Sequence, residues 1–98
     1  MNAGVTIRNG YTLAAFAGGG VSVVGTFTMN GGTITGNEAG YGGGVAVRGG
    51  TFNMNGGTIT GNTAAVIGGG VYLESGTTSG SGTAISGNSA PLDPDKNF

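Results

Sequence analysis

Apolar and polar residues alternate over short segments of this chain, which is the pattern of β-strands with one buried face. Val21–Val23 has two valines on one side and Ser22 on the other, and Thr26–Asn30 alternates threonine with phenylalanine and methionine. Thr33–Thr35 places one isoleucine between two threonines. β-branched and aromatic residues, which strands favour, dominate these segments. The pattern therefore predicts an all-β chain of very short strands, with no sustained helical period.

The same three-strand pattern recurs every 25 to 26 residues. The eight-residue motif NGGTITGN occurs at Asn30–Asn37 and again at Asn55–Asn62, and a looser AISGN begins at Ala84. The motif GGGV also occurs three times, beginning at Gly18, Gly42 and Gly68. Three short strands cannot bury a core alone, so repeats of this length indicate a chain wound into stacked coils.

The repeat boundaries predict one domain, residues 1–98, organised as a β-solenoid. We expect a partial coil at 1–17, coils at 18–41, 42–67 and 68–90, and a tail or partial cap at 91–98. This division corresponds to about 3.5 coils of ~25 residues, with three short strands in each coil.

Stacking places equivalent residues of successive coils above one another, in parallel strands ~4.8 Å apart. Asn37, Asn62 and Asn88 are expected to form an asparagine ladder at a turn, with each amide bonding the next and a left-handed backbone at the asparagine. Gly-Gly pairs are expected to supply corners with positive φ. The apolar columns predicted for the core are Ile7–Ile34–Ile59–Ile85, Val21–Val45–Val71, Val23–Val47–Leu73, Phe27–Phe52 and Met29–Met54.

The pattern GGGVxVxxGTFxMNGGTITGNxA resembles the glycine-rich repeats of right-handed parallel β-helix proteins, which occur in bacterial adhesin-like and autotransporter-like surface proteins. The resemblance covers roughly Gly18 to Ala90. It implies a right-handed parallel β-helix, a structural or adhesive role, and an extracellular or cell-surface location. The family shares a scaffold and not a reaction. The opening residues MNAGVTIRNG lack the features of a signal peptide.

The last copy of the repeat departs from the pattern. Thr78 stands in place of the phenylalanine, Gly80 in place of the methionine and Ala84 in place of the threonine. We expect a thinner core there, followed by a weakened end with a partial cap that uses Leu92 or Phe98. Neither end has a long cap in the sequence, so exposed strand edges predict self-association.

The composition excludes several classes of function but does not point to one. The chain has 25 glycines in 98 residues, no cysteine, no histidine, and a net charge of −1. Seven per cent of its residues are charged and no basic block occurs, so we expect neither a nucleic-acid partner nor membrane insertion. The glycine runs are not followed by Lys-Ser/Thr, which excludes the phosphate-binding loop motif.

The acidic residues do not form the constellation that an enzyme of this fold needs. Glu38 and Glu74 fall in different columns of the predicted stack, and Asp93 and Asp95 lie in the tail. Paired acid–base catalysis requires two carboxylates on facing positions. The alternation of Asp93, Asp95 and Asn97 lacks the following glycine and the distant glutamate of a calcium loop. We therefore expect a protein without enzymatic activity, cofactor or metal.

Two outward-facing sets of side chains are candidates for ligand binding. Thr-x-Thr arrays on solenoid faces are similar in spacing to those of ice-binding proteins, and tyrosines are common in sugar contacts. Tyr11, Tyr41 and Tyr72 are not expected to share one column, so a continuous aromatic platform is not predicted. The candidate threonines are Thr33, Thr35, Thr58 and Thr60.

The function that these features favour is a structural or adhesive β-helix segment that self-associates through its open ends. Two alternatives stay open on the sequence. One is a self-assembling, fibre-forming β-solenoid, and the other is binding of a glycan, a host-surface ligand or ice through an outer face.

Overall fold

The computed structural model describes residues 6–8 and 19–98, and the strand at 6–8 is described by its backbone. Within those ranges the chain is all-β, and no helix is long and apolar enough to cross a membrane. The strands are β1 (Thr6–Arg8), β2 (Val21–Val23), β3 (Thr26–Met29), β4 (Thr33–Thr35), β5 (Glu38–Tyr41), β6 (Val45–Val47), β7 (Thr51–Met54), β8 (Thr58–Thr60), β9 (Thr63–Ile67), β10 (Val71–Leu73), β11 (Thr77–Ser79) and β12 (Ala84–Ile85).

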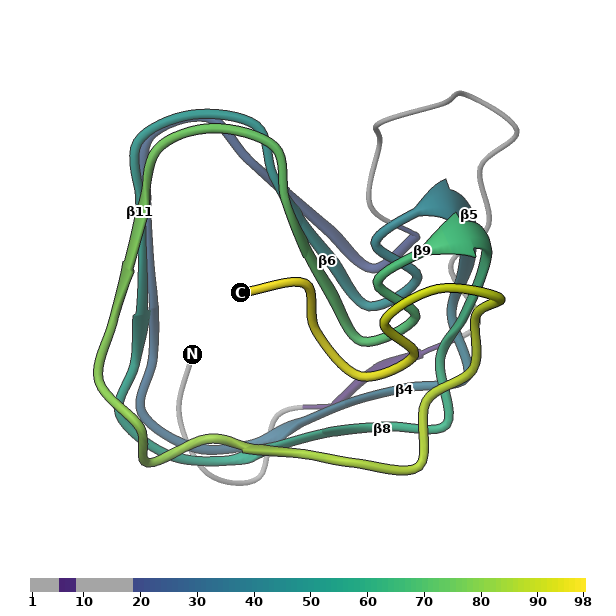
Figure 1. The fold of residues 1–98 in the computed structure, drawn as a ribbon. Coiled ribbons are helices and arrows are strands. Elements are labelled where there is room, and N and C mark those ends of the chain that lie inside the picture. Colours follow the sequence, from purple (N-terminus) through teal and green to yellow (C-terminus); the bar gives the residue numbers. More distant parts are fainter. Residues whose placement is uncertain (1–5, 9–18) are drawn as a thin grey trace.

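The strands form four parallel sheets, each made of equivalent strands from successive repeats. Their orders are β1-β4-β8-β12, β10-β6-β2, β11-β7-β3 and β5-β9. Seen along the stack, the repeats follow nearly the same outline, one behind another (Figure 1). The all-β, parallel prediction is confirmed, and three of the four sheets contain the three strands predicted for each repeat.

Strand register brings the predicted apolar columns together inside the outline. Ile34 pairs with Ile59, and Ile59 pairs with Ile85. The rings of Phe27 and Phe52 stack with centroids 5.3 Å apart and an interplanar angle of 15°. The fully buried side chains in these columns are Met29, Ile34, Val45, Val47, Phe52, Ile59 and Val71; Val23 and Met54 are also buried.

The other members of the columns lie at the ends of the core. Val21, Phe27, Leu73 and Ile85 are partly buried and pack against it. Thr78 is the register partner of Phe52, so the aromatic column stops after two rings. Ile7 is in register with Ile34 through its backbone. The core is therefore thickest in the middle repeat and thinner in the last one.

A fourth sheet, β5-β9, lies at a corner for which the sequence predicted no strand (Figure 1). Ala39 and Ala64 are buried register partners, but the register shifts between Ala39 and Tyr41. The three-strand count was therefore incomplete for two of the repeats. The segments EAGY and TAAVI contain too few large apolar residues to show the alternation of a strand.

Glycine is required where the GGG corner turns, because neighbouring backbones come very close. Gly42 and Gly68 have φ of +63° and +67°, in the left-handed region. A Cβ on Gly43 would lie 2.4 Å from the Thr63 carbonyl oxygen and 2.5 Å from that of Gly69. The repeats can stack at this corner only while these positions carry no side chain.

The segment after β12 continues the stack beyond β9 and β10 and is not a detached tail. Ser89, Leu92 and Lys96 form parallel bridges with Thr63, Ile67 and Val71, respectively. Leu92 is 58% exposed and Phe98 is 39% exposed. The segment is held mainly by backbone hydrogen bonds, including the bond from the Leu92 N–H to the Val66 carbonyl, and by polar side chains. The partial cap predicted to use Leu92 or Phe98 therefore does not depend on burial of these two side chains.

The glycine corner leads to a direct test of the stacking. Gly43→Ala should lower the free energy of unfolding by about 3 kcal/mol or more, because its Cβ would meet rigid backbone oxygens. Gly49→Ala is the control, since a Cβ there has no neighbour within 4 Å. Urea denaturation followed by circular dichroism measures both, and equal stability of the two variants would contradict the close approach.

Candidate functional site

The asparagines that follow β4, β8 and β12 form a ladder that links the repeats. Asn37 and Asn62 are fully buried, and Asn88 is 9% exposed. The side-chain nitrogen of Asn37 donates to Asn62 Oδ1 at 2.9 Å, and that of Asn62 donates to Asn88 Oδ1 at 2.9 Å. The backbone N–H groups of Asn37 and Asn62 donate to the same two oxygens, at 3.1 and 3.0 Å.

Each ladder amide also holds the backbone of its own corner. Asn62 Nδ2 donates to the carbonyls of Ile34 and Thr60 at 2.9 and 3.1 Å. Asn88 Nδ2 makes the equivalent bonds to the carbonyls of Ile59 and Ser86. Among the described residues, no buried side-chain nitrogen or oxygen lacks a hydrogen-bond partner. The hydrogen bonds of these amides therefore serve to hold the fold together.

The left-handed backbone at this corner belongs to glycine and not to asparagine, which corrects the sequence prediction. Gly36, Gly61 and Gly87 precede the ladder asparagines and have φ between +67° and +68°. Gly32 and Gly57 also have positive φ, so each Gly-Gly pair uses its second residue for the turn. A glycine before each asparagine allows the turn without steric cost, and the asparagine keeps an ordinary backbone.

The third glycine of each GGG motif lies against the ladder. A Cβ on Gly20, Gly44 or Gly70 would come within 2.7 to 3.0 Å of the Nδ2 atom of Asn37, Asn62 or Asn88, respectively. A side chain at any of these glycine positions would therefore clash with the ladder asparagine of the same repeat.

Asp95 occupies the next position of that glycine column and ends the ladder. Val45, Val71 and Lys96 are successive register partners, so the residues before them, Gly44, Gly70 and Asp95, are also equivalent. Asp95 Oδ1 accepts hydrogen bonds from the backbone N–H and from Nδ2 of Asn88, at 3.0 and 3.1 Å. The carboxylate thus takes the place that the side chain of a further asparagine would fill.

This role of Asp95 was missed in the sequence, where the residue was read as part of a solvated tail. The available signal was its spacing, because Asp95 follows Gly70 by one repeat length. Asn97 supports the same segment, since its Oδ1 accepts from the Leu73 N–H at 2.6 Å and its Nδ2 donates to the Leu73 carbonyl.

The predicted threonine candidates lie in two rows on the outer side of β4 and β8. Thr33 pairs in register with Thr58, and Thr35 pairs with Thr60. All four are partly exposed. The rows are short, because Ala84 takes the next position after Thr58.

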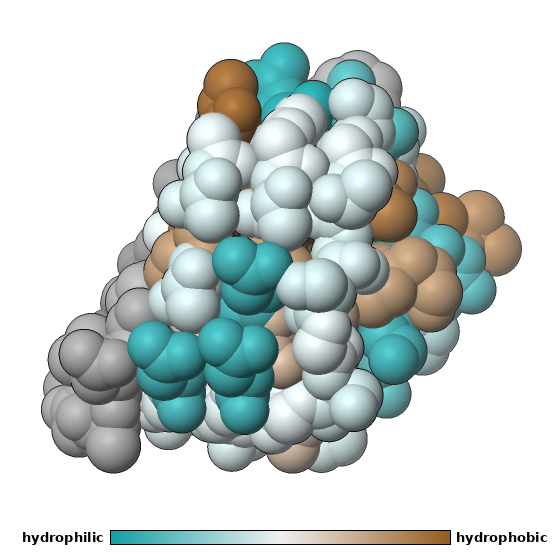
Figure 2. Space-filling view, turned by 90° about the vertical axis from the view of Figure 1, so that its left-hand side faces the viewer, coloured by the Kyte–Doolittle hydropathy of each residue, from teal (hydrophilic) through white to brown (hydrophobic). Residues whose placement is uncertain are grey.

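A larger polar face, which the sequence analysis did not identify, covers the sheet β11-β7-β3. This side of the molecule faces the viewer in Figure 2 as pale and teal residues. Its side chains bond across repeats: Asn53 Nδ2 donates to Thr28 Oγ1 at 3.1 Å, and the Ser79 hydroxyl donates to Asn53 Oδ1 at 2.6 Å. Further bonds join Thr51 with Thr77 and Asn55 with Asn30. These bonds make the face an ordered part of the stack.

Tyr41 and Tyr72 lie together, although the sequence placed them in separate columns. Their ring centroids are 5.0 Å apart and their planes are inclined by 57°. The two tyrosines do occupy separate columns, since Tyr72 pairs with Ala46 and Tyr41 with Ile67. Their contact was not predicted, because it arises where the GGG corner turns sharply and brings the end of β5 beside the outer side of β10. Tyr11, the third candidate, lies outside the described residues.

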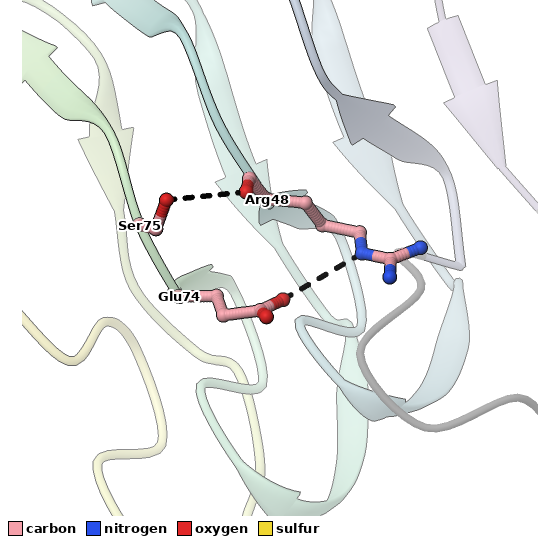
Figure 3. Close-up of polar contacts among 3 residues, drawn as sticks. All are labelled: Arg48, Glu74 and Ser75. Atoms are coloured by element: carbon pink, nitrogen blue, oxygen red, sulfur yellow. Dashed lines mark hydrogen bonds and ion pairs between the residues drawn. The ribbon is translucent and has the colours of Figure 1, made fainter.

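Charged residues adjoin this tyrosine pair. Burial, followed by the charge of Glu74 and the neighbouring Tyr41, raises the pKa of Tyr72 above its usual value. Glu74 Oε2 lies 3.6 Å from Arg48 Nε, and the Ser75 hydroxyl donates to the Arg48 carbonyl at 3.3 Å (Figure 3). Aromatic rings, a carboxylate and a guanidinium group therefore share one outer surface.

The acidic residues do not gather at a common point. Within residues 6–8 and 19–98, no three His, Cys, Asp or Glu side chains lie close enough together to hold a metal ion. Glu74 lies beside Arg48, and Asp95 accepts from Asn88. Comparison with models of known protein families, with curated proteins and with solved structures finds no match to this chain.

Asp95 provides a test of how the ladder ends. Asp95→Ala should lower the free energy of unfolding by about 1–3 kcal/mol, because two donors of Asn88 lose their acceptor. Asp95→Asn keeps an Oδ1 acceptor and should lose less than about 1 kcal/mol. Thermal and urea denaturation compare the variants, and the ladder assignment fails if Ala and Asn at position 95 are equally stable.

Proposed function

We propose that this chain is a non-enzymatic structural segment, a right-handed β-solenoid that belongs to a cell-surface or secreted protein. Its coils follow the sequence repeats, and the segment after β12 begins a last, incomplete coil. Neighbouring parallel strands of one sheet are joined by right-handed connections in about 98% of known cases, which supports this winding.

The observation that carries the proposal is the asparagine ladder with its matching strand registers. Asn37 contacts Asn62 and Asn62 contacts Asn88 with nearly identical distances. Backbone, core and buried amides therefore all use the same translation from one repeat to the next. Such a stack makes a rigid rod whose length grows with repeat number, which suits a spacer that presents surfaces and loops.

Self-association follows from the strand edges at the two ends of the stack. β1 and β12 are the outermost strands of one sheet, and β3 and β11 are the outermost strands of another. An edge strand offers unpaired N–H and C=O groups that can pair with another chain. We assign the adhesion or self-assembly of the protein to these strand edges.

Light scattering coupled to size-exclusion chromatography tests the self-association. The apparent mass should rise above that of the 9.3 kDa chain as concentration increases, and electron microscopy should show rods at high concentration. Added salt should change this little, because the contacts are backbone hydrogen bonds and apolar columns. A strict monomer over the whole concentration range would contradict the proposal.

A second candidate function is glycan binding at the surface formed by Tyr41, Tyr72, Arg48 and Glu74. The observation that favours it is the 5.0 Å contact of the two rings beside an ion pair. Sugar rings pack their C–H faces on aromatic side chains, while charged groups bond their hydroxyls. The threonine rows of β4 and β8 remain a prediction for ice binding.

A glycan array followed by saturation-transfer NMR tests the sugar surface. Tyr72→Ala should reduce the affinity for any bound glycan at least tenfold, because a stacking ring is removed. Thr77→Ala, on the opposite polar face, is the control and should bind normally. Equal binding by both variants, or no binding to any glycan by the native chain, would exclude this surface.

A further inference from the structure

The two outer strands of the sheet β1-β4-β8-β12 are equivalent positions at opposite ends of one stack. Thr6, Ile7 and Arg8 pair with Thr33, Ile34 and Thr35 in the same register by which β12 pairs with β8. Each of these two strands has one neighbour among the described strands. Translating the stack by its own length would therefore place a β1 strand next to β12.

The backbone of β12 leaves hydrogen-bonding groups directed away from β8. Ala84 N–H donates to the Gly57 carbonyl at 2.9 Å, and Ser86 N–H donates to the Ile59 carbonyl at 3.2 Å. Successive peptide groups of a strand point in opposite directions, so the N–H of Ile85 points to the other side. A parallel strand placed on that side would find a donor in the correct position.

The C-terminal segment covers the same end of the stack only in part. It continues the sheets of β9 and β10, through the bridges of Ser89, Leu92 and Lys96. In Figure 1 the yellow chain crosses that corner and then runs toward the middle of the outline. Among residues 6–8 and 19–98, β11 and β12 have no bridge to this segment and no strand on their outer side.

Asp95 restricts which strand can be added next to β12. Its carboxylate fills the place of a further ladder asparagine, so an incoming repeat must lack that side chain. The residue three positions after Ile34, Ile59 or Ile85 is asparagine in each case. Three positions after Ile7 the sequence has Gly10. The first repeat of this chain is thus the one whose sequence is compatible with Asp95.

We infer that a second copy of this chain docks on the β12 end through its β1 strand, in parallel and in the register of the sheet. Thr6, Ile7 and Arg8 of the second copy then pair with Ala84, Ile85 and Ser86 of the first. The two copies build one joint coil, in which the first supplies residues 94–98 and the second supplies β1. This inference rests on the proposed self-association and specifies its interface.

The isoleucine column gives the apolar part of this contact. Ile34 and Ile59 are fully buried, whereas Ile85, at the end of the column, is partly exposed. An incoming β1 strand would place Ile7 in register with Ile85 and so extend the isoleucine column by one position. The lone cation of β1, Arg8, would be the register partner of Ser86.

Cysteine cross-linking tests the register, and the chain has no cysteine of its own. The double variant Thr6→Cys/Ala84→Cys places one thiol on each side of the interface, within the ~4–7 Å Cα separation that a disulfide tolerates. Mild oxidation should give a ladder of dimers, trimers and longer species in non-reducing electrophoresis. The control Thr6→Cys/Thr77→Cys puts the second thiol on β11 and should give little of that ladder.

Two substitutions of opposite charge at position 86 give an independent test that needs no introduced cysteine. Because Arg8 would lie across the interface, Ser86→Glu should strengthen association about two- to fivefold, and Ser86→Lys should weaken it by a similar factor. Ser86 is exposed, so both variants should keep the native circular dichroism spectrum.

The outcomes separate this interface from the broader proposal. Cross-linking by Thr6→Cys/Ala84→Cys, with opposite effects of the two Ser86 variants, supports the β1–β12 contact. If the native chain associates but neither result is obtained, the interface is wrong and the self-association stands. If the native chain remains a monomer and no cross-link forms, both are overturned.

Discussion

The parallel pairing of each repeat with the next is the interaction on which the rest of this structure depends. Strands of two to five residues make too few hydrogen bonds to be stable alone, and the core of one repeat is open above and below. Stacking one repeat on the next supplies both the missing hydrogen bonds and the missing core contacts. A single translation along the stack places each strand, apolar side chain and amide beside its equivalent in the next repeat. A change that alters the translation at one corner therefore affects every sheet.

The glycine content and the asparagine ladder are consequences of that constraint. Close stacking at the corners leaves no room for a Cβ at Gly43 or Gly44. The buried amide of Asn62 would be costly without partners, and the repeat above and the repeat below supply them. The same logic explains Asp95, since the last asparagine needs an acceptor and the glycine column has space for a side chain only there.

The sequence predicted the parts of the structure that repeat and missed the parts that do not. The isoleucines, valines and asparagines recur at the same spacing from one repeat to the next. That spacing was sufficient to predict which residues share a column, because stacked repeats must align equivalent residues. The β5-β9 sheet was missed because alanine and glycine give no alternating pattern. The contact of Tyr41 with Tyr72 depends on the angle of a glycine turn, which residue spacing does not encode. Asn53 interrupts the threonine row of its sheet, which hid the ordered polar face.

The amide protons of the Asn62 side chain test the central claim most directly. If the ladder links the repeats, hydrogen exchange followed by NMR should find these protons strongly protected, exchanging only when the whole stack unfolds. Their protection should match that of the backbone amides of β7 and β8, whereas the side chain of Asn55, whose bond to Asn30 is exposed to solvent, should exchange much faster. Fast exchange at Asn62, in a chain whose backbone amides stay protected, would contradict the account.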